Sequence, residues 1–285
     1  MRGTRNTMRQ TIRVIVIWSL IALAAAESSR SEERLPFSDL QRLFARNTLV
    51  VAILHYDYPP LFTTSESGRL SGSDISLIEN LARELGVAVE FDRQAKSFDE
   101  IIDRVSQGQA DLGLGTTLTL SRAKRVLFSK PYMTLNIALL LNRVKLLEAG
   151  IRSTLKDVQQ LRHTSQKIGL LAGSAYLDYA RKSFPKAELK EYAALPELLA
   201  ATEQGELLAA VRNDLTAQLY LLRHPASIVR LQLFVDRAAK DYVAFSIRPD
   251  SPHVLSWVNT YLFVHQIDLD AGAVMKQYRG GSKPK

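Results

Sequence analysis

A short segment in the first half of the chain gathers residue types suited to binding a small anion. Gly115 is followed by hydroxyl side chains at Thr116, Thr117 and Thr119, and then by Arg122. A glycine lets a ligand approach the backbone closely, and a guanidinium can donate two parallel hydrogen bonds to one carboxylate. The segment therefore indicates a carboxylate site. A threonine-rich loop whose arginine merely pairs with a nearby acid is the alternative that these residue types leave open.

Reactive and metal-binding side chains are scarce. The 285-residue chain has no cysteine, which excludes disulfides, thiolate metal sites and cysteine nucleophiles. Its five histidines are scattered without the spacing of metal ligands. The sequence therefore predicts no catalytic residue, no cofactor and no metal site.

The net charge of +8 comes partly from the N-terminus. Four of the 37 basic residues and none of the 29 acidic residues lie in residues 1–26, which leaves 33 basic residues against 29 acidic ones. Several of the remaining positive charges stand in the last stretch of the chain. Nucleic-acid binding needs a concentrated basic face, so we expect no nucleic-acid partner.

The first 26 residues have the pattern of a secretory signal. Four arginines among the first 13 residues precede an apolar run over 14–26, which ends with small residues at Ala24 and Ala26. The run is short for a membrane span, which needs about 20 apolar residues. Without a cysteine it cannot be a lipoprotein signal. We expect cleavage before Glu27 and a periplasmic product, with an uncleaved N-terminal anchor as the alternative.

After a polar stretch at 27–45, interpreted as a leader, predicted strands and helices alternate in two series. This alternation is typical of α/β folds with a parallel sheet. The first series has strands at 49–54, 87–91 and 111–115 and helices at 74–85 and 98–105. The second has strands at 167–171, 189–192 and 207–211 and helices at 153–161, 175–184, 196–204 and 215–223. An apolar strand at 137–141 separates them, and a strand at 242–247 and a helix at 254–264 follow.

The pattern Gly-x-Thr-x-Thr-x-x-Arg over 115–122, followed by Phe-Ser-x-Pro-Tyr over 128–132, resembles the signature of the bacterial extracellular solute-binding proteins of family 3, the polar amino-acid binders. Weaker matches at 72–78, 107–112, 167–174 and 205–214 follow in the family's order. The resemblance covers roughly residues 46–280.

The resemblance implies a periplasmic-binding-protein type II fold, in which two α/β lobes are joined by two hinge strands and close on a ligand. Lobe 1 would comprise 46–138 plus 243–280, lobe 2 would comprise 139–242, and 281–285 would form a basic tail.

The resemblance also assigns roles to individual residues. Arg122 and the Thr117 hydroxyl match positions that bind the ligand α-carboxylate, and Gly115 matches a backbone carbonyl that accepts from the amine. Asp214 matches the acid that receives the ammonium group. Asp214 also precedes a predicted helix, so a helix N-cap is the alternative role for it.

Aromatic and second-lobe residues complete the expected site. Tyr58 and Phe98 match two positions that sandwich the ligand side chain, although core packing stays open for Phe98. In the second lobe, Ser174 and Ala175 are expected to face the ligand.

Several positions depart from the family's pattern. Leu171, Ala175 and Ala209 stand where many members have polar side chains, so the second lobe is more apolar than usual. His55 replaces an acid of cationic-amino-acid binders, which weighs against Lys or Arg as the ligand.

The resemblance predicts an exported monomer that captures an amino acid or a related organic acid, with an ABC-transporter membrane permease as partner. One alternative is an exported cyclohexadienyl or arogenate dehydratase. By resemblance, such an enzyme would have an acid just after the second-lobe turn. This chain has Tyr176 at that position, and Asp178 is the nearest carboxylate in the sequence. A sensory protein that presents its ligand to a receptor is the other alternative.

Overall fold

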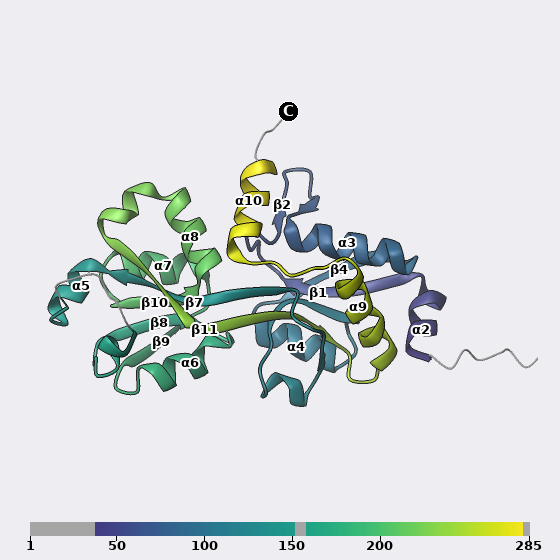
Figure 1. Cartoon of the computed structure of the whole chain (residues 1–285), viewed down its shortest axis with the longest axis horizontal. Helices are drawn as coiled ribbons and strands as arrows, with labels where there is room; N and C mark the ends of the chain where they lie inside the picture. Colours follow the sequence, from purple (N-terminus) through teal and green to yellow (C-terminus); the bar gives the residue numbers. More distant parts are fainter. Residues whose placement is uncertain (1–37, 152–157, 282–285) are drawn as a thin grey trace, which may run out of the picture.

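Two lobes lie side by side and are joined by two long strands (Figure 1). The computed structural model describes residues 38–151 and 158–281. The expected signal peptide, most of the expected leader, the start of the helix expected at 153–161 and nearly all of the basic tail lie outside these residues. Within the described ranges, no helix combines the length and apolar character that crossing a membrane requires.

A single nine-stranded sheet runs through both lobes. The strand order is β4-β1-β5-β11-β7-β10-β8-β9, with β6 paired to β11. The first lobe contributes β1 (Thr48–Leu54), β4 (Ala88–Ala95), β5 (Leu112–Thr117) and β6 (Leu127–Phe128). The second contributes β8 (Lys167–Leu171), β9 (Glu188–Tyr192) and β10 (Ala209–Asn213). The outer pairings within each lobe are parallel, which confirms the predicted α/β class.

The strands that join the lobes are β7 (Met133–Asn142) and β11 (Leu231–Ile247), and they pair antiparallel. Residues 133–136 of β7 pair with the first-lobe half of β11, and residues 137–142 pair with its second-lobe half. Between Asp236 and Lys240 the register shifts, so β11 bulges where the chain passes from one lobe to the other. The predicted strand at 242–247 is only the end of this long strand.

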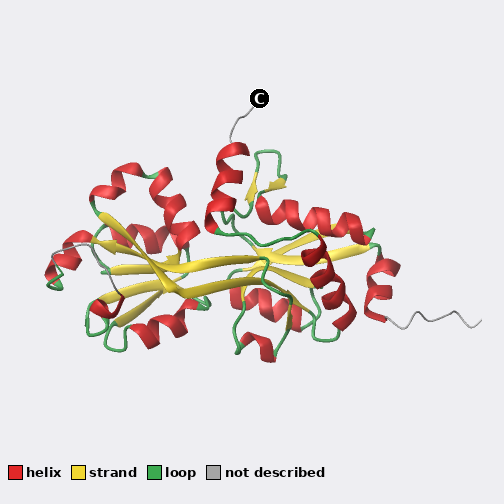
Figure 2. Ribbon diagram, in the orientation of Figure 1, coloured by secondary structure: helices red, strands yellow, loops and turns green. Residues whose placement is uncertain are grey.

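Helices cover both faces of the sheet (Figure 2). In the first lobe these are α2 (Ser38–Arg46), α3 (Ser73–Leu85), α4 (Phe98–Ser106), α9 (Pro252–Val264) and α10 (Ala271–Gly281). In the second they are α5 (Arg143–Glu148), α6 (Tyr176–Ser183), α7 (Leu195–Glu203) and α8 (Asp214–Arg223). Three 3-10 turns are η1 (Arg122–Lys124), η2 (Val158–Leu161) and η3 (Pro225–Val229), and a small hairpin is formed by β2 (Thr63–Thr64) and β3 (Leu70–Ser71).

Alternate side chains of β7 enter different cores of the second lobe. Ile137, Leu139 and Leu141 belong to one cluster of buried residues, whereas Ala138 and Leu140 belong to another. Successive strand residues point to opposite faces, so this part of the sheet is buried on both sides. A sheet covered on both faces explains why the strand reads as one continuous apolar run. A larger cluster fills the first lobe.

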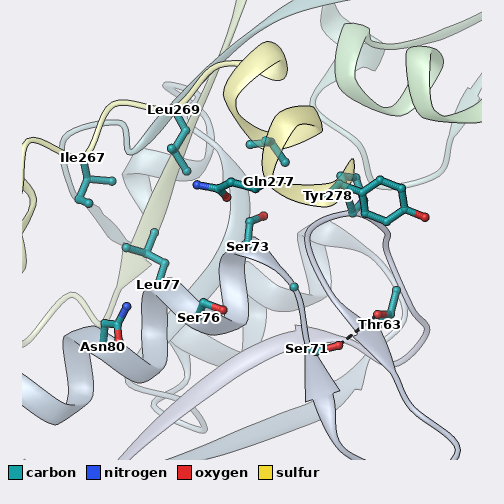
Figure 3. Close-up of a pocket in the computed structure, with 13 residues that line it drawn as sticks. Thr63, Ser71, Ser73, Ser76, Leu77, Asn80, Ile267, Leu269, Gln277 and Tyr278 are labelled. Atoms are coloured by element: carbon teal, nitrogen blue, oxygen red, sulfur yellow. Dashed lines mark hydrogen bonds between the residues drawn. The ribbon is translucent and has the colours of Figure 1, made fainter. Parts of the chain in front are cut away.

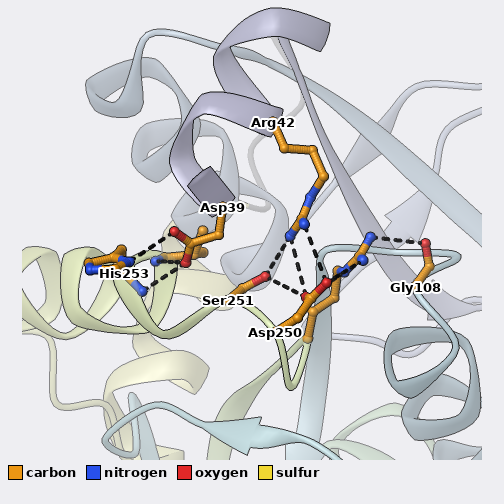
Figure 4. A network of polar contacts seen from close by, with 8 residues as sticks. Asp39, Arg42, Gly108, Asp250, Ser251 and His253 are labelled. Carbon is orange, nitrogen blue, oxygen red and sulfur yellow. Dashed lines mark hydrogen bonds and ion pairs between the residues drawn. The ribbon is translucent and has the colours of Figure 1, made fainter. Parts of the chain in front are cut away.

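Helix α2 was not predicted, because its residues belong to the stretch interpreted as an irregular leader. Asp39 accepts hydrogen bonds from the backbone N–H of His253, at 2.8 Å, and from its ring Nδ1, at 3.0 Å (Figure 4). Arg42 donates to the Ser251 hydroxyl at 2.7 Å. These polar contacts reach residues more than 200 positions later in the chain, so local patterning does not reveal them.

Candidate ligand-binding site

A small enclosed cavity lies between the lobes. Its volume is about 20 Å³, enough for about one water molecule. Six of the eight residues that the sequence predicts for the site line it, and the other two, Arg122 and Asp214, adjoin lining residues. The lining residues are Tyr58, Leu61, Phe98, Gly115, Thr117, Leu135, Ser174, Ala175, Tyr176, Asn213, Asp241 and Val243.

Arg122 joins the two lobes beside this cavity. Its side chain is buried, with 5% exposed, and donates to Oδ1 of Asp99 from Nε at 3.0 Å and from Nη2 at 2.8 Å. Nη1 donates to the carbonyl of Thr117 and Nη2 to the carbonyl of Gly173, each at 3.1 Å. Asp99 and Thr117 belong to the first lobe and Gly173 to the second. One edge of the guanidinium therefore faces an acid of its own lobe, and the other edge faces backbone carbonyls of both lobes.

Gly173 brings the second lobe into contact with the first at this edge. Its φ is +63°, a left-handed conformation that favours glycine. A Cβ atom there would lie 2.8 Å from the Ser97 hydroxyl oxygen and 2.9 Å from its Cβ. The turn that follows β8 can therefore reach Arg122 only because residue 173 has no side chain.

A buried hydrogen-bonded chain fixes the end of β5. Asp74 accepts from the Tyr132 hydroxyl at 3.0 Å, and that hydroxyl accepts from the backbone N–H of Gly115 at 3.1 Å. Burial raises the pKa of Asp74 to about 7, and the hydrogen bond from Tyr132 acts in the opposite direction. Gly115 itself has a φ of +71°. These hydrogen bonds hold the backbone of Gly115, whose carbonyl, by resemblance, accepts from the ligand amine.

The two predicted aromatic residues contact each other. The rings of Tyr58 and Phe98 pack edge to face, with centroids 5.6 Å apart and planes at 89°. The Tyr58 hydroxyl also lies 3.3 Å from Oγ1 of Thr216 in the second lobe. A ligand side chain placed between the rings has to separate them.

The second lobe closes the cavity with α6 and the turn before it. The hydroxyl of Ser174 is buried and has no hydrogen-bond partner among the described residues, and Ala175 adds only a methyl group. The Tyr176 hydroxyl donates to Oδ2 of Asp241 at 2.5 Å and accepts from the Asn213 amide at 3.0 Å. The Tyr176 side chain thus forms part of the cavity wall.

Asp214 begins α8 and is buried. Its Oδ1 accepts from the backbone N–H of Asn136 at 3.2 Å, and its Oδ2 accepts from the Asn136 side-chain amide at 2.7 Å. The helix N-cap is the preceding residue, Asn213, whose side chain accepts from the N–H of Thr216 at 2.8 Å. The alternative N-cap role for Asp214 was therefore wrong.

Two charged residues of the interlobe region were missed in the sequence. Asp241, on β11, lines the cavity. Arg212, near the end of β10, does not line it and is fully buried. A lone arginine directly after an apolar strand was a signal for Arg212. Asp241 stands in a polar stretch of the joining strand, where nothing in the local pattern indicates burial.

A larger cavity lies elsewhere, on the first lobe between α3 and α10 (Figure 3). It has a volume of about 610 Å³ and is lined by residues that include Ser73, Leu77, Gln277 and Tyr278. None of the eight predicted site residues lines it. The ligand site that the sequence indicates is the smaller cavity between the lobes.

Two α/β lobes with an enclosed cavity between them define the architecture of a solute-binding protein. Residues 49–280 match the bacterial extracellular solute-binding proteins, family 3. The chain belongs to this family.

Individual relatives are distant. The chain is 25% identical over 158 residues to the arginine-binding periplasmic protein of Mannheimia haemolytica, an overlap of 55% of this chain and 60% of that protein. It is 26% identical over 176 residues to the L-cystine-binding protein TcyJ of Escherichia coli strain K12, with 60% of each chain covered. The matched region spans about 60% of the length of these curated relatives.

Solved structures align over most of the chain. An ancestral amino acid-binding protein, described as a precursor of cyclohexadienyl dehydratase, is 28% identical with a TM-score of 0.68, covering 86% of this chain and 99% of that one. An ancestral arginine-binding protein bound to glutamine is 25% identical with a TM-score of 0.66, covering 82% and 97%. The type II periplasmic-binding-protein fold is confirmed.

Proposed function

We propose that this protein captures a small amino acid between its two lobes, for uptake by an ABC transporter. The observation that carries the proposal is Arg122, which donates to acceptors of both lobes at the edge of the interlobe cavity. When the lobes part, the contact from Nη2 to Gly173 breaks, while Nη1 keeps its contact to Thr117 in the same lobe. A ligand carboxylate is the natural replacement acceptor, since it takes two parallel bonds from one guanidinium.

Amino acids are favoured as the ligand class for two reasons. Relatives are named for binding arginine and L-cystine, and one solved relative holds glutamine. The interlobe region of this chain also supplies acids for an ammonium group, with Asp214 as the position matched in the family. In this proposal Thr117 and Gly115 support the ligand head, Tyr58 and Phe98 enclose the side chain, and the lobes correspond to 46–138 plus 243–280 and to 139–242.

Binding without chemistry is part of the proposal. A dehydratase of this fold would need an acid after the second-lobe turn, and there Tyr176 donates to Asp241 while Asp178 is exposed. We expect the ligand to be recovered unchanged after prolonged incubation. Conversion of prephenate or arogenate at an ordinary enzymatic rate would favour the dehydratase instead.

Export is proposed from residues 1–26. We expect N-terminal sequencing of protein from the periplasm to begin at Glu27. An intact Met1 on a membrane-bound product would contradict cleavage. The proposed partner is a membrane permease, and the proposed state of the binding protein itself is a monomer.

A ligand panel tests the function. Thermal unfolding is followed with each of the common amino acids and with organic acids that lack an amine. The proposal predicts that a subset of amino acids raises the melting temperature and that the matched acids without an amine raise it less. No rise with any amino acid would overturn it.

A further inference from the structure

Arg212 is a buried cation without an adequate partner. Its side chain is 0% exposed, and its Nη2 donates to the Tyr58 hydroxyl. Nε and Nη1 have no hydrogen-bond partner among the described residues. The guanidinium carbon lies 5.8 Å from the ring centroids of both Tyr58 and Tyr176. Burying a charge is costly unless it is paired and hydrogen-bonded, so this guanidinium is suited to an anion that the chain does not supply.

Asp241 is a buried acid that forms no ion pair with a cation in the described part of the chain. Its side chain is 1% exposed, its Oδ2 accepts from the Tyr176 hydroxyl, and its Oδ1 has no well-aligned hydrogen bond from the described residues, with the Thr117 hydroxyl as the neighbouring neutral donor. Burial raises the pKa of Asp241, while hydrogen bonds from the Tyr176 and Thr117 hydroxyls and the positive charges of Arg212 and Arg122 act in the opposite direction. Asp241 therefore shares the electrostatic environment of Arg212 but forms no ion pair with it within 4 Å.

The hydroxyl groups of Tyr58 and Tyr176 make the hydrogen bonds to Arg212 and Asp241 that we assign below to a ligand. A cavity of about 20 Å³ cannot hold an amino acid, so a ligand enters only when the lobes part or when the lining rings of Tyr58 and Tyr176 move. The Tyr58 hydroxyl is at present the acceptor for Arg212, and the Tyr176 hydroxyl is the donor to Asp241. Once both rings move, Arg212 needs an anionic acceptor and Asp241 needs a cationic donor. A carboxylate and an ammonium group satisfy both.

Tyr58 has space to move into. An apolar groove of about 420 Å³ is lined from both lobes, including Tyr56, Pro59, Leu199 and Thr216. Thr216 lines this groove and lies 3.3 Å from the hydroxyl of Tyr58, which lines the interlobe cavity, so the groove and the cavity adjoin at this contact. A rotation of the Tyr58 ring towards this groove would break its contact with Arg212.

The pair formed by Arg212 and Asp241 is distinct from the pair matched in the family. Arg122 donates to Asp99 and two carbonyls, and each oxygen of Asp214 accepts one hydrogen bond from Asn136, so neither residue hydrogen-bonds to Arg212 or Asp241. We propose that Arg212 and Asp241 form a second charged subsite, which binds the distal carboxylate and ammonium of a ligand that carries an amino-acid head at each end. This inference rests on the proposed function, in which Arg122 and Asp214 hold the proximal head.

Calorimetric titration with five probes tests the subsite. Meso-diaminopimelate and L-cystine carry two heads, L-glutamate carries only the distal carboxylate, L-lysine only the distal ammonium, and L-norleucine neither. We expect at least one two-headed probe to bind about tenfold or more tighter than norleucine, since hydrogen bonds to charged groups contribute ~1.5–3 kcal/mol and 1.4 kcal/mol is tenfold. Glutamate and lysine should lie between.

Variants locate the effect. Arg212→Met and Asp241→Asn should each remove most of the two-headed preference, measured in each variant as the ratio of two-headed to norleucine affinity. Ligand-free Arg212→Met should melt at or above the wild-type temperature, because it removes a buried unpaired charge. Asp236→Asn is the matched control, since Asp236 accepts from Tyr179 at 2.8 Å on the same strand and helix but does not line the cavity. It should leave every affinity unchanged.

The outcomes separate the two proposals. If norleucine binds as tightly as both two-headed probes, or if Arg212→Met and Asp241→Asn both keep the preference, the subsite is overturned while amino-acid binding stands. If no probe and no other amino acid binds, the proposed function is overturned and the subsite with it.

Discussion

The Arg122 guanidinium meets the Asp99 carboxylate along one edge only, with Nε and Nη2 donating to the same oxygen at 3.0 and 2.8 Å. Asp99 stands in the first turn of α4, and its side chain is about half exposed. The acid therefore orients the arginine without covering its other edge. That edge is held by the Thr117 and Gly173 carbonyls, and of these only Gly173 moves away when the lobes separate.

Substituting Arg122 tests this geometry. We expect Arg122→Lys to weaken ligand binding by roughly a hundredfold, since an ammonium cannot donate the two parallel bonds and a pair of charge-assisted bonds is worth ~3 kcal/mol. The melting temperature of the ligand-free variant should change little. Arg125→Lys is the matched control. Arg125 stands three residues after Arg122 and forms an ion pair with Asp103 at the surface. Calorimetric affinity of Arg122→Lys within a few-fold of wild type would refute the assignment.

Lobe closure depends on a bare backbone at Gly173. Gly173→Ala should lower ligand affinity by about tenfold or more, because its Cβ would clash with Ser97 and because the residue has positive φ. Gly68→Ala carries the same kind of backbone strain, with φ +81°, but no atom lies within 4 Å of its Cβ. Calorimetry on both variants separates strain from clash. Equal affinity losses in the two variants would contradict a role in closure.

Asp214 is expected to select ligands that bear an amine. Asp214→Ala should remove the preference for an amino acid over the matched acid without an amine, because the ammonium loses its charged partner. The affinity for the amine-free acid should fall much less. Competition binding with the two compounds measures the ratio. A ratio unchanged from wild type would contradict the assignment of the ligand ammonium to Asp214.

The buried Asp74 predicts a pH dependence of stability. Its pKa rises from 3.8 in the unfolded chain to about 7 in the fold, so between these values the folded state holds a proton that the unfolded state has released. The free energy of unfolding should therefore fall as the pH rises from 4 to 7, by up to about 4 kcal/mol from this residue. Asp74→Asn keeps an acceptor for Tyr132 and should flatten this slope. Denaturant unfolding of both proteins across the range measures it, and parallel curves would disprove it.

Much of the fold was predictable because its signals are local. The strand at 49–54 and the helix ending at Gly86 follow from an apolar run, a helical stripe and a left-handed C-cap, all within a few residues. The residues around Gly115 and Arg122 could be found for the same reason, since their types and spacing occur in one segment.

What escaped prediction depends on contacts between distant segments. Arg212 is buried by the loop that carries Tyr58, which lies 154 positions earlier. Asp241 is enclosed because β11 crosses between the lobes. The polar stretch of this strand has no apolar alternation from which its burial could be predicted. Likewise, α2 is tied to the start of α9 by polar side chains. Each of these needs the assembled tertiary structure before its burial is visible.

The central claim is that the folded, two-lobed state binds a ligand that the unfolded chain does not. The direct measurement is the free energy of unfolding in denaturant, taken at increasing concentrations of the amino acid that stabilises the protein most. We predict a rise that is linear in the logarithm of ligand concentration and reaches about 2.7 kcal/mol at a hundredfold excess over the dissociation constant. The same series with Arg122→Lys should start to rise only at much higher ligand concentration. A free energy of unfolding that stays constant for the wild-type protein at every ligand concentration would contradict capture between the lobes.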